Sequence, residues 1–179
     1  MAETQPGERM TPARRTLILS GAALGLIGAS TVIEADPVLL WNASPSVPVG
    51  FYAVTPIDTP HVGDLVAVRP PPPLGQWLFE NGYLGRDTPL LKRVVALPGA
   101  EICRRGTTIT IAGHAVAEAR ERDRLGRRLP VWQGCQLLRE DQVFLLNPEE
   151  PASLDGRYFG PLGADTIIVR ATPVWTREG

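Results

Sequence analysis

Turn-forming residues divide the chain from Trp41 onward into short apolar runs, and this division constrains the fold more than any other feature. Glycine and proline number 18 each among 179 residues, with no repeat that would indicate collagen. The runs typical of strands lie at 50–54, 64–69, 90–97, 101–102, 107–111, 115–117, 142–146 and 166–172. Many short strands with dense turns predict a mainly β domain built as a barrel-like or coiled sheet. The proline run at 70–73 and the stretch after it are expected to form a long loop.

Charge and motif content exclude several classes of function. The net charge is −1 at pH 7, so the chain as a whole offers no electrostatic footprint for nucleic acid. The histidines and cysteines are two each and lack the spacing of a zinc site. Neither standard glycine-rich phosphate loop is present. We therefore expect no metal, no cofactor and no nucleic-acid partner.

An uncharged segment lies close to the N-terminus. Residues 1–15 are polar and include three arginines, residues 16–33 carry no charge, and Glu34 and Asp36 follow. At about 1.5 Å per residue, a helix over 16–33 would be roughly 27 Å long, which is close to the thickness of a hydrocarbon core. The basic flank indicates that the N-terminus stays in the cytoplasm.

This segment predicts that the rest of the chain is exported to the periplasm, anchored in a bacterial inner membrane. The predicted cytoplasmic N-terminus, transmembrane signal anchor and periplasmic domain lie at 1–15, 16–34 and 35–179. A cleaved signal peptide with small residues near 28–30 is the alternative, and it would export the same domain. A buried soluble helix is the third interpretation.

Two cysteines follow the predicted membrane segment. Cys103 and Cys135 are the only cysteines of the chain. In an oxidising periplasm they are expected to form a disulfide, which would stabilise the fold by about 3–4 kcal/mol on the chain-entropy model. Two separate buried thiols are the alternative.

Two further segments have more than one interpretation. Residues 120–128 contain five arginines, one glutamate and one aspartate. A solvated loop or short exposed helix is the preferred interpretation, and a contact for anionic lipid head groups or an acidic partner is the alternative. The aromatic stretch 77–79 is expected to cover the core, with contact to a membrane interface as the alternative.

A single lysine is the candidate general base. Lys92 is the one lysine among 18 basic residues, and it lies in the apolar run 90–95. Burial lowers the pKa of an ammonium group from its ordinary value of about 10.4, so a neutral amine becomes available to accept a proton. Chance survival of one lysine in an arginine-rich composition is the alternative explanation.

Two serines lie together in a loop that contains prolines. Ser44 and Ser46 alternate with Pro45, and Pro48 follows, so the backbone of this loop is restrained. A serine hydroxyl becomes nucleophilic when a base takes its proton, and a Ser–Lys pair is a known variant of the catalytic triad. We expect the Ser46 hydroxyl to lie within hydrogen-bonding distance of the Lys92 amine. Ordinary turn serines are the alternative.

Three segments together resemble the sequence boxes of type I signal peptidases, family S26. The segment 91–101 (LKRVVALPGAE) resembles their lysine box, the loop around Ser46 resembles their nucleophile box, and 144–147 with 153–162 resembles their third box. The short SVPVGFY form, the small size and the paired cysteines are most similar to the conjugative-transfer, TraF-type branch. The resemblance covers roughly Trp41 to the C-terminus and implies a signal-peptidase-like coiled β-sheet or barrel after an N-terminal membrane helix.

The resemblance implies the residues that carry the chemistry. Ser46 matches the nucleophile and Lys92 matches the general base. Ser44 matches the hydroxyl that joins the backbone N–H of Ser46 in the oxyanion hole. Here a proline lies two residues after Ser46, which departs from the family pattern and leaves Ser44 as the alternative nucleophile.

The resemblance also implies three supporting residues. Ser153 matches the serine that orients the lysine, and Asp155 and Arg157 match an ion pair that supports the site. Two departures occur in this third box: Gly156 replaces a serine, and the residues 145–146 replace the usual Gly-Asp.

The implied function is that of a membrane-anchored Ser–Lys endopeptidase that needs no cofactor. Its expected partners are the inner membrane and an exported precursor protein, above all a pilin or another propeptide of conjugative transfer by type IV secretion. Members of this branch mature pilin precursors, and some join the pilin ends into a circle. A general type I signal peptidase and a non-catalytic scaffold of a conjugation apparatus are the alternatives.

Overall fold

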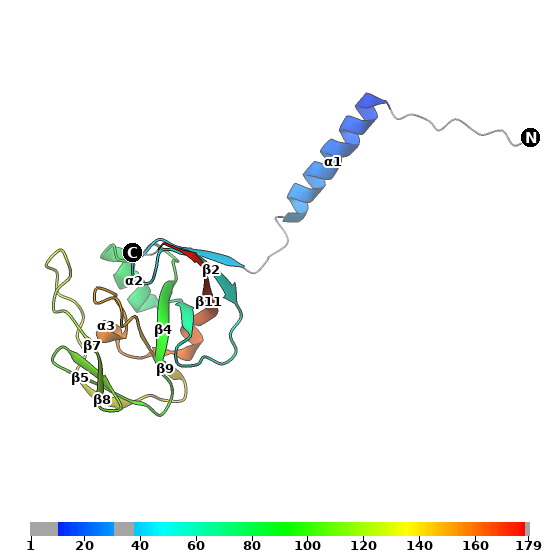
Figure 1. Ribbon diagram of the computed structural model, residues 1–179. Helices are drawn as coiled ribbons and strands as arrows, with labels where there is room; N and C mark the ends of the chain where they lie inside the picture. The colour runs from blue at the N-terminus through cyan, green and yellow to red at the C-terminus, as the bar shows by residue number, and fades with distance from the viewer. Residues whose placement is uncertain (1–10, 31–37, 178–179) are drawn as a thin grey trace, which may run out of the picture. The chain divides into compact units, whose positions relative to one another are not determined.

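A computed structural model describes residues 11–30 and 38–177, and the chain divides into the units Met1–Asp36 and Pro37–Gly179 (Figure 1). In the first unit, α1 (Pro12–Ser30) is a helix of 19 residues. It begins with a proline, which is favoured in the first turn because no backbone N–H is required there. Among the described residues, no helix is both long enough and apolar enough to cross a membrane. The predicted anchor, 16–34, overlaps α1. Residues 31–34 of that predicted anchor lie outside the described residues.

A seven-stranded sheet forms the larger part of the second unit. Its strands follow the order β1-β2-β11-β3-β4-β9-β10, and every neighbouring pair is antiparallel. The strands are β1 (Leu39–Asn42), β2 (Gly50–Thr55), β3 (Leu65–Val68), β4 (Leu90–Ala96), β9 (Gln142–Leu146), β10 (Leu162–Gly163) and β11 (Ile167–Thr176). The long β11 has a register irregularity against both β2 and β3. Such irregularities bend a strand, and the sheet curls into a half-barrel.

A second sheet of four strands extends from the first. Its order is β7-β6-β5-β8. The strands are β5 (Glu101–Arg105), β6 (Thr108–Ile111), β7 (His114–Glu118) and β8 (Gly134–Leu137). Cys103 on β5 is paired in register with Cys135 on β8, and the two form a disulfide. All four residues of β8 are exposed, so the predicted disulfide joins an otherwise exposed edge strand to its neighbour.

The mainly β, coiled-sheet prediction is confirmed. Each run predicted as a strand from the turn pattern overlaps a strand of the structure. Three strands were not predicted, namely β1, β8 and β10, which are short or exposed.

The prediction of a loop after the proline run is wrong. The structure has a helix, α2 (Pro72–Glu80), which begins with two prolines. Proline is tolerated there because the first N–H groups of a helix have no partner within it. Leu78 is fully buried, whereas Phe79 is exposed, so part of the aromatic stretch covers the core as expected.

Apolar side chains cover both faces of the central strands. All four residues of β3 are buried, and alternate residues belong to different apolar clusters. Neighbours along a strand point to opposite faces, so neither face of the sheet is open to water here. The adjacent strand β4 carries Leu91, Lys92 and Val94, all buried. The sheet therefore places a lysine in the interior of the domain.

Candidate active site

The loop between β1 and β2 is organised by the side chain of Asn42. This residue is 7% exposed, and its amide lies within hydrogen-bonding distance of three carbonyl oxygens. The acceptors are the carbonyls of Ser44, Val47 and Pro48, at 2.7, 3.1 and 3.2 Å. The backbone N–H of Ser44 donates back to Asn42 Oδ1 at 3.1 Å. The prolines and this amide together hold the two serines of the loop in place.

The two serines of this loop are hydrogen-bonded to each other. The Oγ atoms of Ser44 and Ser46 lie 2.8 Å apart, and the backbone N–H of Ser46 donates to Ser44 Oγ over a long 3.4 Å. Ser44 is exposed and Ser46 is half-buried. The two predicted oxyanion donors are thus bonded to each other, and an incoming oxyanion would replace that weak contact.

Lys92 has the properties expected of a general base. Its side chain is 3% exposed, and its Nζ donates to Ser153 Oγ at 2.8 Å. Burial, with a smaller contribution from Arg157, lowers the pKa of Lys92 from 10.5 to about 8, against the opposing charge of Asp155. A substantial fraction of the amine is therefore neutral near pH 8 and can accept a proton.

Asn147 joins the third box to strand β4 on both sides of the lysine. Its amide donates to the carbonyl of Leu91 at 3.0 Å, and its Oδ1 accepts from the N–H of Arg93 at 3.2 Å. The same amide lies 3.4 Å from Ser153 Oγ, the acceptor of the lysine hydrogen bond. Asn147 therefore positions the backbone around Lys92 and the hydroxyl that receives its hydrogen bond.

A buried ion pair between Asp155 and Arg157 holds the segment that carries Asn147 and Ser153. Arg157 Nε and Nη2 donate to the two carboxylate oxygens of Asp155 at 2.9 and 2.8 Å, and both side chains are at most 1% exposed. Asp155 also accepts from the N–H of Asn147, and Arg157 also donates to the carbonyls of Asn147 and Glu150. Burial opposes the charge of Arg157, but its contacts with Asp155 raise its pKa overall. The pair fixes the turn that carries Asn147 and Ser153.

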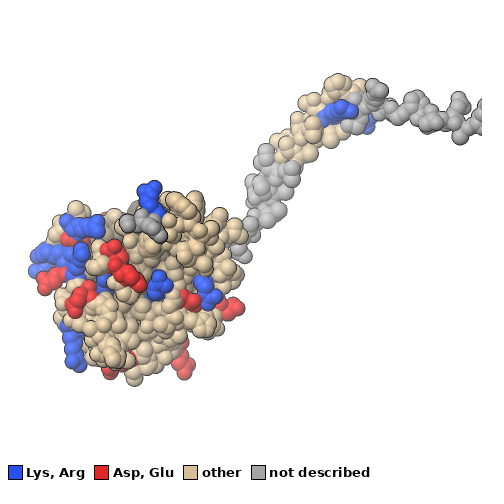
Figure 2. Space-filling model, viewed as in Figure 1, with Lys and Arg blue, Asp and Glu red and all other residues tan. Residues whose placement is uncertain are grey.

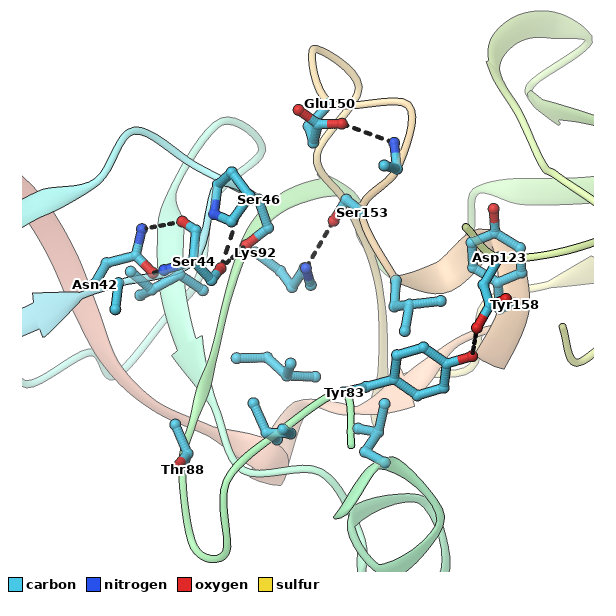
Figure 3. Close-up of a pocket in the computed structure, with 18 of the residues that line it drawn as sticks. Asn42, Ser44, Ser46, Tyr83, Thr88, Lys92, Asp123, Glu150, Ser153 and Tyr158 are labelled. Atoms are coloured by element: carbon cyan, nitrogen blue, oxygen red, sulfur yellow. Dashed lines mark hydrogen bonds between the residues drawn. The ribbon is translucent and has the colours of Figure 1, made fainter. Parts of the chain in front are cut away.

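A cleft of about 740 Å³ brings these groups together. Ser44, Ser46, Lys92 and Ser153 line it, and apolar side chains form much of its wall. Figure 3 shows the serine loop on one side of the cleft, with Lys92 and Ser153 beside it. Each residue predicted to take part directly in the chemistry thus reaches the same cavity.

One predicted contact is not formed. Among residues 38–177, no hydrogen bond joins Ser46 to Lys92: the amine donates to Ser153, and the Ser46 hydroxyl is paired with Ser44. The physical reason is that each group already has another hydroxyl as its partner at 2.8 Å. Catalytic hydrogen bonds are often long or misaligned without substrate, so this difference leaves the roles of Ser46 and Lys92 as predictions.

Sequence reasoning missed Asn42 and Asn147 as functional residues. Both are at most 7% exposed and act on the loops that carry the serines. An asparagine two residues before a proline-containing turn was the available signal for Asn42. Asn147 directly follows the strand of the third box, and its partners on β4 lie more than 50 residues away in sequence.

The donor atoms of the cleft suit nucleophilic and acid–base chemistry. In the part of the chain that the structure describes, Glu101, Cys103 and Cys135 are the residues of metal-ligand type that lie close together. Both sulfurs are bonded to each other, so neither is the thiolate that a metal prefers. The cleft instead offers three serine hydroxyls and the amine of Lys92.

Comparison with known proteins places the chain in a family. Residues 13–176 match the family model described as signal peptidase, peptidase S26. The chain belongs to the S26 signal peptidase family. The resemblance inferred from the three sequence boxes is thereby confirmed, and family membership supports a peptidase-like role.

Relatives of this S26 chain have names from conjugative transfer. A probable conjugal transfer protein TraF of Sinorhizobium fredii is 35% identical over 145 residues, covering 75% of this chain and 76% of that protein. The conjugal transfer protein TraF of Agrobacterium fabrum is 35% identical over 176 residues, covering 89% and 90%. Among solved structures, a signal peptidase I of Enterococcus faecalis matches with a TM-score of 0.36 and 22% identity, covering 62% of this chain and 95% of that chain.

The structure explains one departure of this S26 chain from the family pattern. At Gly156, a Cβ atom would lie 2.7 Å from the ring of Phe144 and 2.8 Å from the carbonyl oxygen of Leu145. Both distances are shorter than real Cβ contacts, and one of the neighbours is backbone. A serine at this position would not fit beside Phe144, so glycine is required between Asp155 and Arg157.

Proposed function

We propose that the chain is a serine endopeptidase in which Ser46 is the nucleophile and Lys92 the general base. The observation that carries this proposal is the buried amine of Lys92, whose pKa is about 8 and which opens into the same cleft as Ser46. Burying a lysine beside a hydroxyl lowers the stability of the fold. Groups in clefts whose pKa is shifted in this way are characteristic of catalytic sites.

The first chemical step begins with a rotation of the Ser46 side chain. When a substrate carbonyl enters, the Ser46 hydroxyl leaves Ser44 and turns to the neutral amine of Lys92. Lys92 takes the hydroxyl proton as Oγ forms a bond to the carbonyl carbon. The Ser44 hydroxyl and the N–H of Ser46, no longer bonded to each other, donate to the oxyanion. The Ser153 hydroxyl and Asn147 hold the amine in place throughout.

The second step releases the amine product and leaves an acyl-enzyme. The protonated Lys92 gives its proton to the leaving nitrogen as the C–N bond breaks, and Ser46 keeps the acyl group as an ester. Water then attacks the ester, and Lys92 again accepts and returns a proton. If the N-terminal amine of the same substrate attacks instead, the product is a ring. Neither route requires a metal or a cofactor.

The substrate is proposed to be an exported precursor of a conjugative transfer apparatus, above all a pilin. Two relatives at 35% identity carry conjugal transfer names, which favours this class over general secretory precursors. The apolar cleft suits an extended peptide chain.

The compartment is proposed to be the periplasm, with residues 35–179 outside the cytoplasm, 16–34 as the membrane segment and 1–15 in the cytoplasm. The charge pattern of the N-terminal segment supports this orientation. The disulfide between Cys103 and Cys135 supports an oxidising compartment.

Peptide cleavage is expected to depend on pH through Lys92. Because the neutral amine is the active form, kcat/KM should rise with pH until about 8, the pKa of Lys92, and level off above it. Below that point the rate should fall about tenfold for each pH unit. The measurement is kcat/KM for a quenched peptide across this range. A profile centred near pH 6.5 would instead point to a histidine base.

Stability offers an independent check of the same group. The folded chain releases the Lys92 proton near pH 8, and the unfolded chain holds it up to about 10.5. Unfolding therefore takes up a proton within this window, so stability should rise with pH there. Lys92→Met should lack that rise. The difference in free energy of unfolding between the two proteins, followed across this pH range, therefore reports on Lys92 alone, because all other titratable groups are the same in both.

The function is tested by co-expression with candidate pilin precursors, followed by the intact mass of the product. The wild-type chain should shorten its substrate, and ring closure would lower the mass by one further water. Ser46→Ala should leave the precursor uncut, whereas Thr59→Ala, which removes an exposed hydroxyl elsewhere, should process it normally. Full-length precursor with all three proteins would support a scaffold. Cleavage of ordinary secretory precursors alone would support a general signal peptidase.

A further inference from the structure

An arginine-rich hairpin forms one wall of the cleft. Residues 120–128, here called the arginine hairpin, fold back on themselves between β7 and β8. A β-bridge joins Arg122 to Arg128, and the N–H of Asp123 donates to the carbonyl of Arg127 at 3.0 Å. The segment is a mostly exposed turn, in agreement with the solvated loop preferred from sequence, and several of its side chains also line the cleft.

The hairpin is fixed to the body of the domain through one aspartate. Asp123 accepts from the hydroxyl of Tyr83 and from Arg127 Nε, each at 2.6 Å. The hydrogen bond from Tyr83 and those from Arg127 lower the pKa of Asp123 far below its ordinary value. Arg127 also donates to the carbonyl of Asn81 and lies over the ring of Tyr83. The charges of Asp123 and Arg127 thus compensate each other, and both residues have a structural role.

Three other arginines of the hairpin have no such compensation. Arg120, Arg122 and Arg124 line the cleft and are exposed. Within residues 38–177, none of the three lies in an ion pair, and Arg122 donates only to the carbonyl of Gly126. Figure 2 shows basic side chains gathered on this side of the domain, with acidic ones among them.

The acidic groups near this wall do not cancel its charge. Glu121 belongs to the hairpin and is exposed but does not line the cleft, whereas Glu150 lines it and accepts from the N–H of Ala152. Apart from the compensated Asp123, Glu150 is the acidic side chain among the described cleft residues, against three uncompensated arginines. The rim of the cleft is therefore electropositive on the side of the hairpin.

The electropositive rim and the nucleophile lie on different sides of the cavity. Figure 3 shows Ser44 and Ser46 on one side, Tyr83 and Asp123 on the other, and Lys92 between them. A peptide whose scissile carbonyl sits at Ser46 would cross the cleft before it met the hairpin. The groups that the arginines contact would then belong to residues several positions from the scissile bond.

We propose that Arg120, Arg122 and Arg124 are specificity-determining residues that select precursors with acidic side chains several positions from the cleavage site. This inference rests on the proposed function and extends it to the charge of the substrate. A peptide is favoured over a lipid head group because the arginines line the concave cavity that also holds Ser46. Carboxylates pair with guanidinium groups through parallel hydrogen bonds, which gives direction as well as attraction.

The test measures peptide binding rather than cleavage. Full-length protein carrying Ser46→Ala is titrated with fluorescent peptides that share an apolar, small-residue core. Pairs of glutamate, glutamine or lysine are placed at successive positions on either side of the core. We expect the glutamate peptide to bind roughly tenfold more tightly than the glutamine peptide at one set of positions, and high salt to remove the difference.

Charge reversal identifies the residues responsible. Arg124→Glu should weaken binding of the glutamate peptide about fivefold to tenfold and strengthen that of the lysine peptide. Arg128→Glu is the matched control, because Arg128 is exposed on the same hairpin but does not line the cleft. It should change either affinity less than about twofold.

Three results would overturn the proposal. The first is equal binding of glutamate and glutamine peptides at every position, and the second is equal effects of the two reversals. The third is an Arg124→Glu variant that keeps its affinity for the glutamate peptide but loses binding to vesicles of phosphatidylglycerol. The last would assign the arginines to lipid. Charge-dependent binding without any cleavage by the wild-type chain would count against the serine peptidase alone, so the two proposals fail separately.

Discussion

Replacing Lys92 with arginine or methionine is expected to abolish precursor processing, with a loss of at least about a thousandfold in rate. Arginine keeps a positive charge at this position, but its guanidinium cannot be neutralised at working pH and so cannot accept the Ser46 proton. Methionine fills a similar volume and removes the amine altogether. The two variants therefore reach the same loss by different routes, and cleavage of a quenched peptide measures both.

The methionine variant also tests whether lost activity could result from lost folding. Lys92 is 3% exposed and its charged form is disfavoured by burial, so an apolar side chain at this position should leave the domain at least as stable at neutral pH. Thermal unfolding of Lys92→Met should therefore show a midpoint no lower than that of the wild type. The Ser153 hydroxyl loses the lysine as a partner but keeps its contact with the amide of Asn147. Processing by either folded variant would refute the assignment of Lys92 as the base.

Arg157→Met is expected to lower the free energy of unfolding by about 3–5 kcal/mol. The substitution leaves the carboxylate of Asp155 buried without its cation and removes donors from two carbonyl oxygens. An uncompensated buried charge is among the costliest defects that a single substitution can create. Urea denaturation should show a lower midpoint, and activity should fall with it because Asn147 and Ser153 lose their support.

Arg170→Met is the matched control for this prediction. Arg170 also binds an aspartate through two hydrogen bonds, to Asp64 at 3.1 and 2.9 Å. Those side chains are 35% and 18% exposed, so water can replace the lost partner, and the cost should stay below about 1 kcal/mol. Equal losses in the two variants would show that burial does not set the strength of the Asp155–Arg157 pair.

Much of the fold follows from local sequence signals. Glycine and proline mark the ends of the central strands, and the apolar runs between them form β2, β3, β4, β9 and β11. The exposed strand β8 carries no apolar pattern, because all four of its residues face water and pairing with β5 alone defines it. Helix α2 was missed because prolines that begin a helix look the same in sequence as prolines in a loop.

The candidate site could be predicted from sequence where its residues stand out by type or by their neighbours. A lone lysine in an apolar run, serines beside prolines and the order of three boxes were enough to name six residues that the structure describes around one site. The roles of Asn42 and Asn147 depend on which carbonyls and amides the fold brings to them, and local sequence does not specify those partners. The Ser44–Ser46 contact likewise depends on the exact path of the loop.

The close packing at Gly156 makes evolutionary changes at positions 144 and 156 depend on each other. The space that a side chain at 156 would need is filled by the ring of Phe144 and the carbonyl oxygen of Leu145. A lineage that acquires a serine there must replace the phenylalanine with something smaller and also move the carbonyl oxygen of Leu145, which would lie 2.8 Å from the new Cβ. The two positions should therefore change in concert among descendants, and a sequence search that demands a hydroxyl at that point would overlook members built like this one.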